Sequence, residues 1–421
     1  MCPGAFPPVT LCTFRLHSSV TMVQLTGAIA PLTHTYAGLW HRTAPGLPLG
    51  MRRFSAAQQA DRERDVDLLM EKSLPRIDRF REMEETERAR YAGRAHTALG
   101  KLLMDGQDPR VDRFFDECEA TGKAFVRRAR DFDPALTGDE IHQALRNQWV
   151  FNSIEKFLGR PLSLSSASLA YSLMYPYTDN WLDAADHTPE EREEFQESLR
   201  RCLAGEARPD EPGEFPRLVK MIEEEYPRDR HPDVFDALLA ILRAQHKGLA
   251  LQRPVDGPDA NALDSITIEK GGASVAVDGY LVRGELSPAE LHALFGYGVV
   301  LQFIDDLQDM DEDAAAGHSS MFTRGRAAGP LDELTGRLVR FTHATVALLD
   351  SPGGGGFLPR LVGASCLFLI LEAVARHREH YTQGYLGALE EYSPLRFPFL
   401  AGLHDRVRRA MAGHEDVLIS V

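Results

Sequence analysis

The sequence of 421 residues predicts an all-α protein, and three observations indicate this fold class. From about residue 61 onward, apolar residues recur at three- and four-residue spacing, and the alternation typical of strands is scarce. Ser or Thr stands three positions before Glu in TGDE (137–140), TPEE (188–191) and SPAE (287–290), which is the capping-box arrangement of a helix start. Pro189 and Pro288 then occupy the first helical position, where a missing N–H costs little.

Four short segments rich in Pro, Gly and Asp interrupt this helical pattern. They are 208–216, 226–233, 253–259 and 351–356. None is long enough to link two domains, and no internal repeat is visible. We therefore expect a single all-α domain over 61–421, with roughly ten to fourteen helices if helices and loops have ordinary lengths.

The first 60 residues differ in composition from the rest of the chain. They contain no Asp or Glu, whereas the remainder contains all 62. We expect an N-terminal extension over 1–60 that is partly disordered, with Met22 and Met51 as alternative translation starts. The segment lacks the uninterrupted apolar core, preceded by positive charge, of a secretory signal.

The bulk composition excludes some classes of function. A formal charge of −15 argues against a general nucleic-acid binder, because no basic surface offsets phosphate repulsion. The five cysteines are scattered without a CxxC pair, so we expect free thiols and a cytoplasmic protein. We expect no transmembrane segment, because the most apolar stretch (361–375) is short and contains Glu372, as a core helix would.

An acidic cluster closes the most apolar helix. The helix that Ser287 opens runs through GYGVVLQFIDDLQD, so Asp305 and Asp309, four residues apart, project from one face, with Asp306 beside them. Like charges at this spacing repel, and solvation or a cation must offset the repulsion. The preceding apolar run favours an interior or cleft location over a solvated helix end.

A second acidic cluster lies 126 residues earlier, in SLAYSLMYPYTDNWLDAAD (168–186). Asp179 and Asp183 are again four residues apart, and Pro176 should kink or start a helix just before them. Either cluster alone is better explained by a solvated helix face. Two clusters that each close an apolar stretch favour carboxylates facing each other on neighbouring helices, a set that suits Mg²⁺ and its phosphate ligands.

These motifs resemble those of the class I isoprenoid synthase superfamily. LQFIDDLQD resembles the second aspartate-rich motif of trans-prenyl diphosphate synthases, and it also aligns with that of squalene and phytoene synthases, which would bring in Asp313. YTDNWLD resembles the first acidic motif of large bacterial terpene synthases. The resemblance is clear over about 160–330, and it implies an all-α bundle around a deep apolar pocket.

The resemblance also implies a diphosphate-binding lysine. ITIEKGGASVAVDGYLVRG (266–284) places Lys270 before small residues, 35 positions ahead of Asp305, as in prenyl synthases. Lys is a compact charge suited to phosphate, and Gly271 and Gly272 permit close approach of a helix or ligand. Arg283 is a second candidate for the same role. For Arg324 and Arg326 a solvated loop is the better interpretation.

The resemblance therefore predicts a Mg²⁺-dependent terpene synthase that acts on a prenyl diphosphate. It implies three Mg²⁺ ions, or Mn²⁺ in their place, and it is compatible with a homodimer. The predicted metal-binding and catalytic residues are Asp179, Asp183, Asp305, Asp306 and Asp309, with Lys270 and Arg283 binding the diphosphate. The aromatic candidates for stabilising a carbocation, for each of which core packing is the better explanation when it is taken singly, are Tyr171, Tyr175, Trp181, Tyr297 and Phe303.

The chain departs from the family in two ways that leave alternatives open. No tandem Arg follows Asp183, and Arg200–Arg201 comes too late to match the pair that holds a second diphosphate in chain-elongating synthases. The Asn/Asp, Ser and Glu metal triad of smaller terpene cyclases is also absent. The alternatives are a prenyltransferase, by elongation or head-to-head coupling, and a non-catalytic helical protein that binds divalent ions or a partner through its acids.

Overall fold

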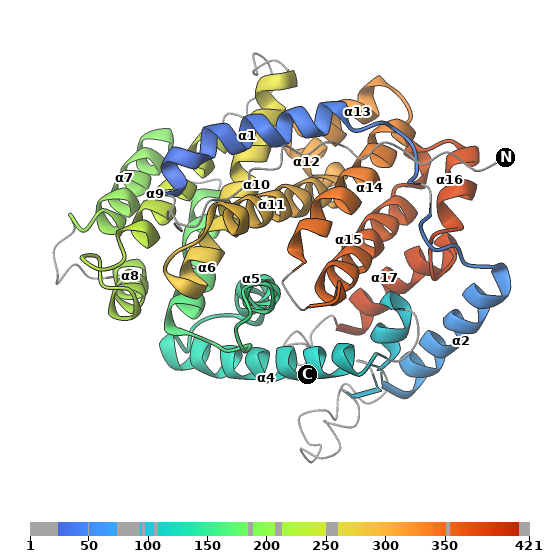
Figure 1. Cartoon of the computed structure of the whole chain (residues 1–421), viewed down its shortest axis with the longest axis horizontal. Helices are drawn as coiled ribbons and strands as arrows, with labels where there is room; N and C mark the ends of the chain where they lie inside the picture. The colour runs from blue at the N-terminus through green and yellow to red at the C-terminus, as the bar shows by residue number, and fades with distance from the viewer. Residues whose placement is uncertain are drawn as a thin grey trace.

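The computed structural model describes residues 24–48, 50–73, 93–94, 97–104, 108–183, 188–206, 213–249, 260–350 and 354–411. At residues 179, 180, 182, 183, 189, 404, 407, 408, 410 and 411 it describes the backbone alone. Within these ranges every regular element is a helix, which confirms the all-α class (Figure 1). The helices are α1 (Leu25–Arg42), α2 (Ala56–Ser73), α4 (Pro109–Phe132), α5 (Gly138–Phe157), α6 (Ser166–Asp183), α7 (Pro189–Leu203), α8 (Glu214–Glu225), α9 (Pro232–Gly248), α10 (Ala260–Arg283), α11 (Pro288–Gln308), α12 (Met310–Ala316), α13 (Met321–Ala328), α14 (Asp332–Val346), η3 (Ala347–Leu349), α15 (Phe357–Arg376), η4 (Arg378–His380), α16 (Gln383–Glu390) and α17 (Phe397–Met411).

The predicted helix starts are confirmed. Thr137, Thr188 and Ser287 are the N-caps of α5, α7 and α11, and each forms the reciprocal capping box with the Glu three residues later. The predicted break at 226–233 separates α8 from α9, although α9 already begins at Pro232. The break at 253–259, and the first residues of those at 208–216 and 351–356, lie outside the described residues. The described ranges hold sixteen α-helices, more than the ten to fourteen expected, because α12, α13 and α16 have only seven or eight residues and are too short for a spacing pattern.

An antiparallel pair, α10 and α11, forms the centre of the bundle. The two backbones approach closely at Gly271 and Gly298, where a Cβ on Gly298 would lie 2.1 Å from the carbonyl oxygen of Gly271. Gly272 likewise packs against the ring of Phe295. The small residues after Lys270 therefore serve close helix packing, one of the two roles that the sequence suggested.

Helix α1 covers this pair and belongs to the core. In Figure 1 it runs across α10, α11 and α14. Trp40 is buried, and its ring lies 4.7 Å from that of Phe303 and 5.5 Å from that of Phe341. The domain therefore extends N-terminal to residue 61, to include at least α1; residues 1–23 lie outside the described part. The lack of Asp and Glu in residues 1–60 therefore did not mark the start of the folded domain. The packing of α1 shows that the domain begins earlier than residue 61.

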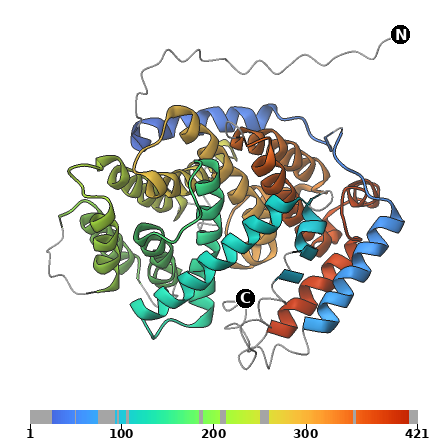
Figure 2. The ribbon, with the colours of Figure 1, turned by 60° about the horizontal axis from the view of Figure 1, so that its bottom comes forward.

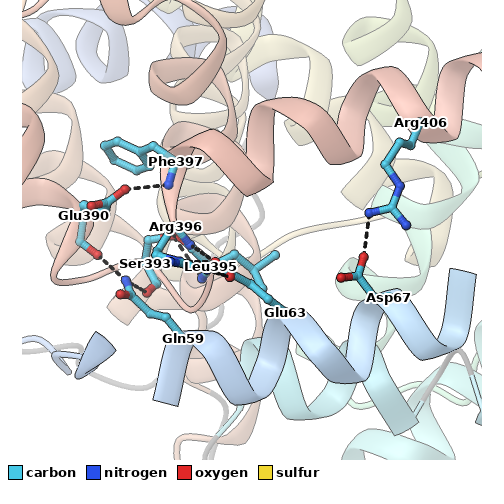
Figure 3. Close-up of polar contacts among 9 residues, drawn as sticks. All are labelled: Gln59, Glu63, Asp67, Glu390, Ser393, Leu395, Arg396, Phe397 and Arg406. Atoms are coloured by element: carbon cyan, nitrogen blue, oxygen red, sulfur yellow. Dashed lines mark hydrogen bonds and ion pairs between the residues drawn. The ribbon is translucent and has the colours of Figure 1, made fainter. Parts of the chain in front are cut away.

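A polar cluster ties α2 to the C-terminal helices (Figures 2 and 3). Glu63 is 4% exposed and accepts hydrogen bonds from the backbone N–H and the guanidinium of Arg396, each at 2.9 Å. The Arg396 guanidinium holds the pKa of Glu63 below its ordinary value despite the burial that opposes this. Gln59 donates to the carbonyl oxygens of Glu390 and Ser393, so α2 is anchored at both α16 and α17.

Helix α15 is, in the described part of the chain, the one helix long and apolar enough to cross a membrane. Half of its most apolar stretch is buried, and it packs against α11, α14 and α17. This packing is that of the core helix predicted from the sequence.

Candidate functional site

The acidic cluster of α11 lies at the C-terminal end of the helix. Residues 293–300 are all buried, so the apolar run holds α11 inside the bundle. Asp305 and Asp306 occupy the last turn, and Asp309 is the C-cap. A carboxylate at a helix C-terminus faces the negative end of the helix dipole, so this position adds to the repulsion among the three groups.

A pocket of about 130 Å³ opens at this end of α11. It brings Lys270 of α10 together with Asp305, Asp306 and Asp309, as the sequence predicted for these four residues. The pocket also includes Asp313, which the alignment with squalene and phytoene synthases brought in. Its lining residues are Gly248, Thr267, Lys270, Gln302, Asp305, Asp306, Asp309, Asp313, His318, Ser319 and Ser320.

Asp306 is the most buried carboxylate of the pocket, at 8% exposure. Its Oδ1 accepts a hydrogen bond of 2.9 Å from Nε2 of Gln302, one turn earlier, while its buried Oδ2 has no hydrogen-bond partner. The pKa of Asp306 is raised to about 7, mainly by burial and also by the charge of Asp305, although Gln302 and Lys270 oppose the shift. An unpartnered buried oxygen in a polar pocket is an available ligand atom.

The neighbouring carboxylates are also perturbed. Burial raises the pKa of Asp309 to about 6, with added repulsion from Asp305, and burial likewise raises the pKa of Asp313. Asp305 is about half exposed and lies 3.7 Å from a guanidinium nitrogen of Arg146 in α5. Negative charge is therefore in excess around the pocket, which favours binding of a cation.

Arg146 and His318 are site residues that the sequence analysis missed. Arg146 reaches Asp305 from α5, 159 positions earlier, and His318 lies 3.5 Å from Asp313 in the turn after α12. Neither residue sits in a motif. Only the packing of α5 beside α10 and α11 brings Arg146 to this end of the bundle.

The first acidic motif lies at the C-terminal end of α6. The side chains of Asp179 and Asp183 are outside the described part of the structure, so their direction is not assigned. Pro176 lies inside α6, so the helix starts ten residues before it, at Ser166. The hydroxyl of Tyr175 lies 3.4 Å from Oγ of Ser274, and Asn147 donates to both Ser172 and Asp278.

These contacts define the register of α6 against α10. Ser172 lies near Asp278 and Tyr175 near Ser274, so the two helices run antiparallel. One further helical turn along each brings the backbone at position 179 to the level of Lys270. The C-terminal ends of α6 and α11 therefore lie at the same end of the bundle.

The structure does not bring Arg283 to this pocket. Arg283 ends α10, thirteen residues after Lys270 or roughly 20 Å along the helix axis. Its guanidinium binds the carboxylate of Glu290, at 2.9 Å for one of the two contacts, and stabilises the start of α11. Arg324 pairs with Asp264 and Arg326 with Asp311, and neither arginine lines the pocket that contains Lys270.

The aromatic candidates are largely core residues. Phe303 packs against Trp40 and Phe341, and Trp181 stacks on Phe195. Tyr171 and Tyr297 are at most 6% exposed. Tyr175, half-buried and one turn from the motif, is the member of the set nearest to Lys270 along the α6–α10 contact.

A larger cavity of about 700 Å³ lies elsewhere in the bundle. It is lined by apolar residues of α14 and α15, such as Val339, Leu367 and Leu371, and by the segment 50–54. None of the predicted site residues lines it. This cavity is therefore distinct from the acidic pocket.

The residues of the acidic pocket fit Mg²⁺ as a ligand. Carboxylate oxygens and water are the ligands that Mg²⁺ prefers, and the pocket offers several carboxylates, one with an unpartnered buried oxygen. A divalent cation would relieve the repulsion that raises the pKa values of Asp306 and Asp309. The positive charge of Lys270 can in addition bind an anionic ligand in the same pocket.

Comparison of the chain with protein-family models, with curated proteins and with solved structures finds no match to any of them.

Proposed function

We propose that the protein is a Mg²⁺-dependent class I terpene synthase that ionises an allylic prenyl diphosphate and releases diphosphate. The observation that carries the proposal is the pocket in which Lys270 meets Asp305, Asp306 and Asp309. Oxygen ligands for divalent ions and a cation for phosphate lie there side by side, and a metal-bound diphosphate needs both. Neither a solvated acidic helix end nor a plain salt bridge accounts for the unpartnered Oδ2 of Asp306.

In this proposal each residue has a defined part. Asp305, Asp306 and Asp309 hold Mg²⁺ from α11, and Asp179 and Asp183 complete the set from α6. When bound, Mg²⁺ supplies Lewis-acid polarisation of the leaving diphosphate. Lys270 neutralises the remaining negative charge of the diphosphate, and Gln302 orients Asp306 by donating to its Oδ1.

The register of α6 relative to α10 supports a role for the first acidic motif in binding the metal ions. The contact between Tyr175 and Ser274 lies one turn below both position 179 and Lys270. A diphosphate held by Lys270 is then within the reach of groups at the C-terminal end of α6. The charge of Arg146, next to Asp305, lies at the same end.

Two exposed hydrophobic side chains, Trp149 and Leu369, are candidates for contact with a hydrocarbon substrate. Trp149 follows Arg146 by three residues on α5 and is 47% exposed. Leu369 of α15 is 36% exposed. In sequence it lies between Cys366 and His377, and both of these residues are near α11: Cys366 is close to Tyr297, and His377 contacts Gln308. Single exposed hydrophobic side chains are ordinary on a protein surface, so this part of the proposal rests on the place of the two residues on α5 and α15. We place the prenyl chain along these residues, where it excludes water from the cation.

Cyclisation is favoured over chain elongation. The first tandem arginine pair after the first motif is Arg200–Arg201, and Arg200 is a partly exposed residue of α7 that binds Glu197 and Glu206. Among the described residues that follow the first motif, this pair is therefore engaged elsewhere, which favours a reaction with one diphosphate. Prenyl transfer is the second candidate.

The test is turnover of purified protein with C10 to C25 allylic diphosphates and Mg²⁺, with and without isopentenyl diphosphate. Hydrocarbon or alcohol products without isopentenyl diphosphate are expected. Longer prenyl diphosphates, formed only when it is present, would support the transferase instead. Tight Mg²⁺ binding without diphosphate release from any substrate would support the non-catalytic alternative and reject both enzymes.

A further inference from the structure

A cluster of two histidines and two carboxylates lies beside the end of α11, outside the acidic pocket. Its members are Asp311 of α12, His377 after α15, and Glu379 and His380 of η4. The ligand atoms of Asp311, His377 and Glu379 all lie within 4.8 Å of one another. Nε2 of His380 is 3.8 Å from Oδ1 of Asp311 and 3.9 Å from Oε1 of Glu379.

We propose that this cluster is a second metal site, for a divalent transition-metal ion of the Zn²⁺ class. Imidazole and carboxylate together suit Zn²⁺, whereas Mg²⁺ prefers oxygen ligands alone. Metal–ligand bonds of about 2.0–2.2 Å in a tetrahedral site place ligand atoms roughly 3.3 Å apart. The 3.0 Å between Nδ1 of His377 and Oδ2 of Asp311 is close to this value. Nε2 of His380 lies near Oδ1 of Asp311 and Oε1 of Glu379, so His380 is a more distant candidate for the fourth ligand.

The environment of His377 is that of a metal ligand. Its side chain is only 7% exposed, and its Nε2 lies 3.2 Å from the backbone carbonyl oxygen of Gln308. That carbonyl can only accept, so Nε2 carries a proton. In the neutral imidazole, Nδ1 then presents a lone pair to Oδ2 of Asp311, 3.0 Å away. Metal-bound histidines donate their other ring N–H to a backbone carbonyl or carboxylate in the same way.

Nδ1 of His377 and Oδ2 of Asp311, 3.0 Å apart, are joined either by a proton on Nδ1 or by a metal ion between them. The metal ion is the proposed explanation, and a second proton on His377 is the competing one. Arg326 also binds Asp311, through Oδ1, which leaves Oδ2 for the metal. The two explanations differ in one measurable property, the affinity of the protein for a transition metal.

A metal in this cluster would fasten α12 to the end of α15. Because His377 also holds the carbonyl of Gln308, the last residue of α11, the site would fix the helix end that carries Asp305 and Asp309. The role is structural and does not depend on the proposed reaction.

The experiment is a titration of the full-length, chelator-treated protein with Co²⁺, followed by visible absorption. We expect one equivalent of Co²⁺ to give the intense band of a tetrahedral ion, which Zn²⁺ abolishes and Mg²⁺ does not. Glu379→Gln and His380→Ala should each weaken Co²⁺ binding by roughly 10- to 100-fold. Glu379 is 63% exposed at its side chain, so its replacement leaves folding intact.

Two controls separate this site from the acidic pocket. Glu312→Gln changes an exposed acid of α12 outside the cluster and should leave the Co²⁺ affinity unchanged. Asp305→Asn removes a ligand of the acidic pocket and should leave the Co²⁺ band unchanged. Absence of the band, or wild-type affinity in both Glu379→Gln and His380→Ala, would overturn the proposal and leave an ion pair between His377 and Asp311. No outcome depends on turnover.

Discussion

The arrangement of the carboxylates at the end of α11 destabilises the folded protein when no ligand is bound. Asp306 is buried with one unpartnered oxygen, and Asp305 and Asp309 repel it. Groups that cost stability in the free protein are commonly those that bind a ligand. At the scale of single residues, this strain distinguishes Asp306 from Asp311, which binds both Arg326 and His377.

The exposed acids of the pocket should be required for activity and dispensable for folding. Asp305→Asn is expected to lower the rate of diphosphate release about 10²- to 10³-fold, because it removes a metal ligand and charge at the leaving group. Circular dichroism and thermal unfolding should match the wild type. Glu312→Gln is the matched control, and equal activity in the two variants would contradict the assignment.

Asp306 should make the metal-free protein less stable as the pH rises. Its pKa is about 7 in the folded protein and near 3.8 when unfolded, so the folded state binds more protons between these values. The free energy of unfolding therefore falls from about pH 4 to pH 7 and then levels off.

Asp306→Asn should remove this pH dependence and raise the free energy of unfolding at pH 7.5 by roughly 1–3 kcal/mol, while weakening Mg²⁺ binding. Urea unfolding at several pH values, without metal, measures it. An Asn variant less stable than the wild type at pH 7.5 would show that the carboxylate is compensated by a partner.

At the scale of elements, the contact between α10 and α11 sets the geometry of the pocket. Gly271 and Gly298 bring the two backbones together one turn from Gln302. Gly298→Ala would place a Cβ 2.1 Å from a backbone oxygen, which cannot move as a side chain does.

Gly298→Ala should therefore lower the free energy of unfolding by about 1–3 kcal/mol and separate Lys270 from the aspartates, lowering activity. Gly363→Ala, in α15, is the control, since its Cβ would meet only a methyl group at 3.9 Å. That variant should be neutral or slightly more stable. Equal thermal midpoints for the two variants would contradict the close-contact argument.

Trp149 should shape the product without supporting the fold. About half of this residue is exposed, so Trp149→Ala should leave the thermal midpoint within about 1–2 °C of the wild type. It should change the ratio of products, or raise premature quenching by water to give linear alcohols. Gas chromatography of the products measures this, with the equally exposed Leu68→Ala in α2 as control. An unchanged product ratio would remove Trp149 from the proposed hydrocarbon site.

Local signals in the sequence predicted the elements well. Capping boxes at Thr137, Thr188 and Ser287 depend on residues three positions apart, so the start of a helix is visible without tertiary information. Pro176 shows the limit of local signals. A proline inside a helix is tolerated in α6, where burial against α5 and α8 holds the helix together.

The site was predictable where its residues belong to one motif or to helices in a fixed register. Lys270 and Asp305 lie on consecutive antiparallel helices, so their meeting follows from the short connection between α10 and α11. The prediction that Arg283 joins the site is wrong, because Arg283 lies at the other end of α10, where it binds Glu290. Arg146 and His318 were not predictable, because their proximity depends on how α5 and the turn after α12 pack.

At the scale of the whole molecule, the pocket depends on many elements meeting at one end of the bundle. Residues of α9, α10, α11, α12 and the turn after it line it, and α5 and α6 approach it. Helix α1 packs on the α10–α11 pair through Trp40, which contacts Phe303, although the sequence analysis assigned this helix to an N-terminal extension. The composition of residues 1–60 gives information on charge only. The domain is defined by aromatic contacts between residues far apart in the sequence, such as Trp40 and Phe303, and composition does not reveal these contacts.

Such a shared site should couple ligand binding to the stability of the whole protein. A ligand that binds only the folded state stabilises it by about 2.7 kcal/mol at 100 times its dissociation constant. Inorganic diphosphate with Mg²⁺ should therefore raise the thermal midpoint by roughly 3–6 °C, whereas either alone should have a smaller effect, because the anion needs Lys270 and the ions together. Lys270→Ala and Asp309→Asn should each abolish this shift of the thermal midpoint. Arg283→Gln should retain the shift, although the midpoint of the ligand-free variant should be lower because the contact with Glu290 is lost. A full shift in Lys270→Ala would show that the diphosphate binds elsewhere, and loss of the shift in Arg283→Gln alone would move the site to the other end of α10.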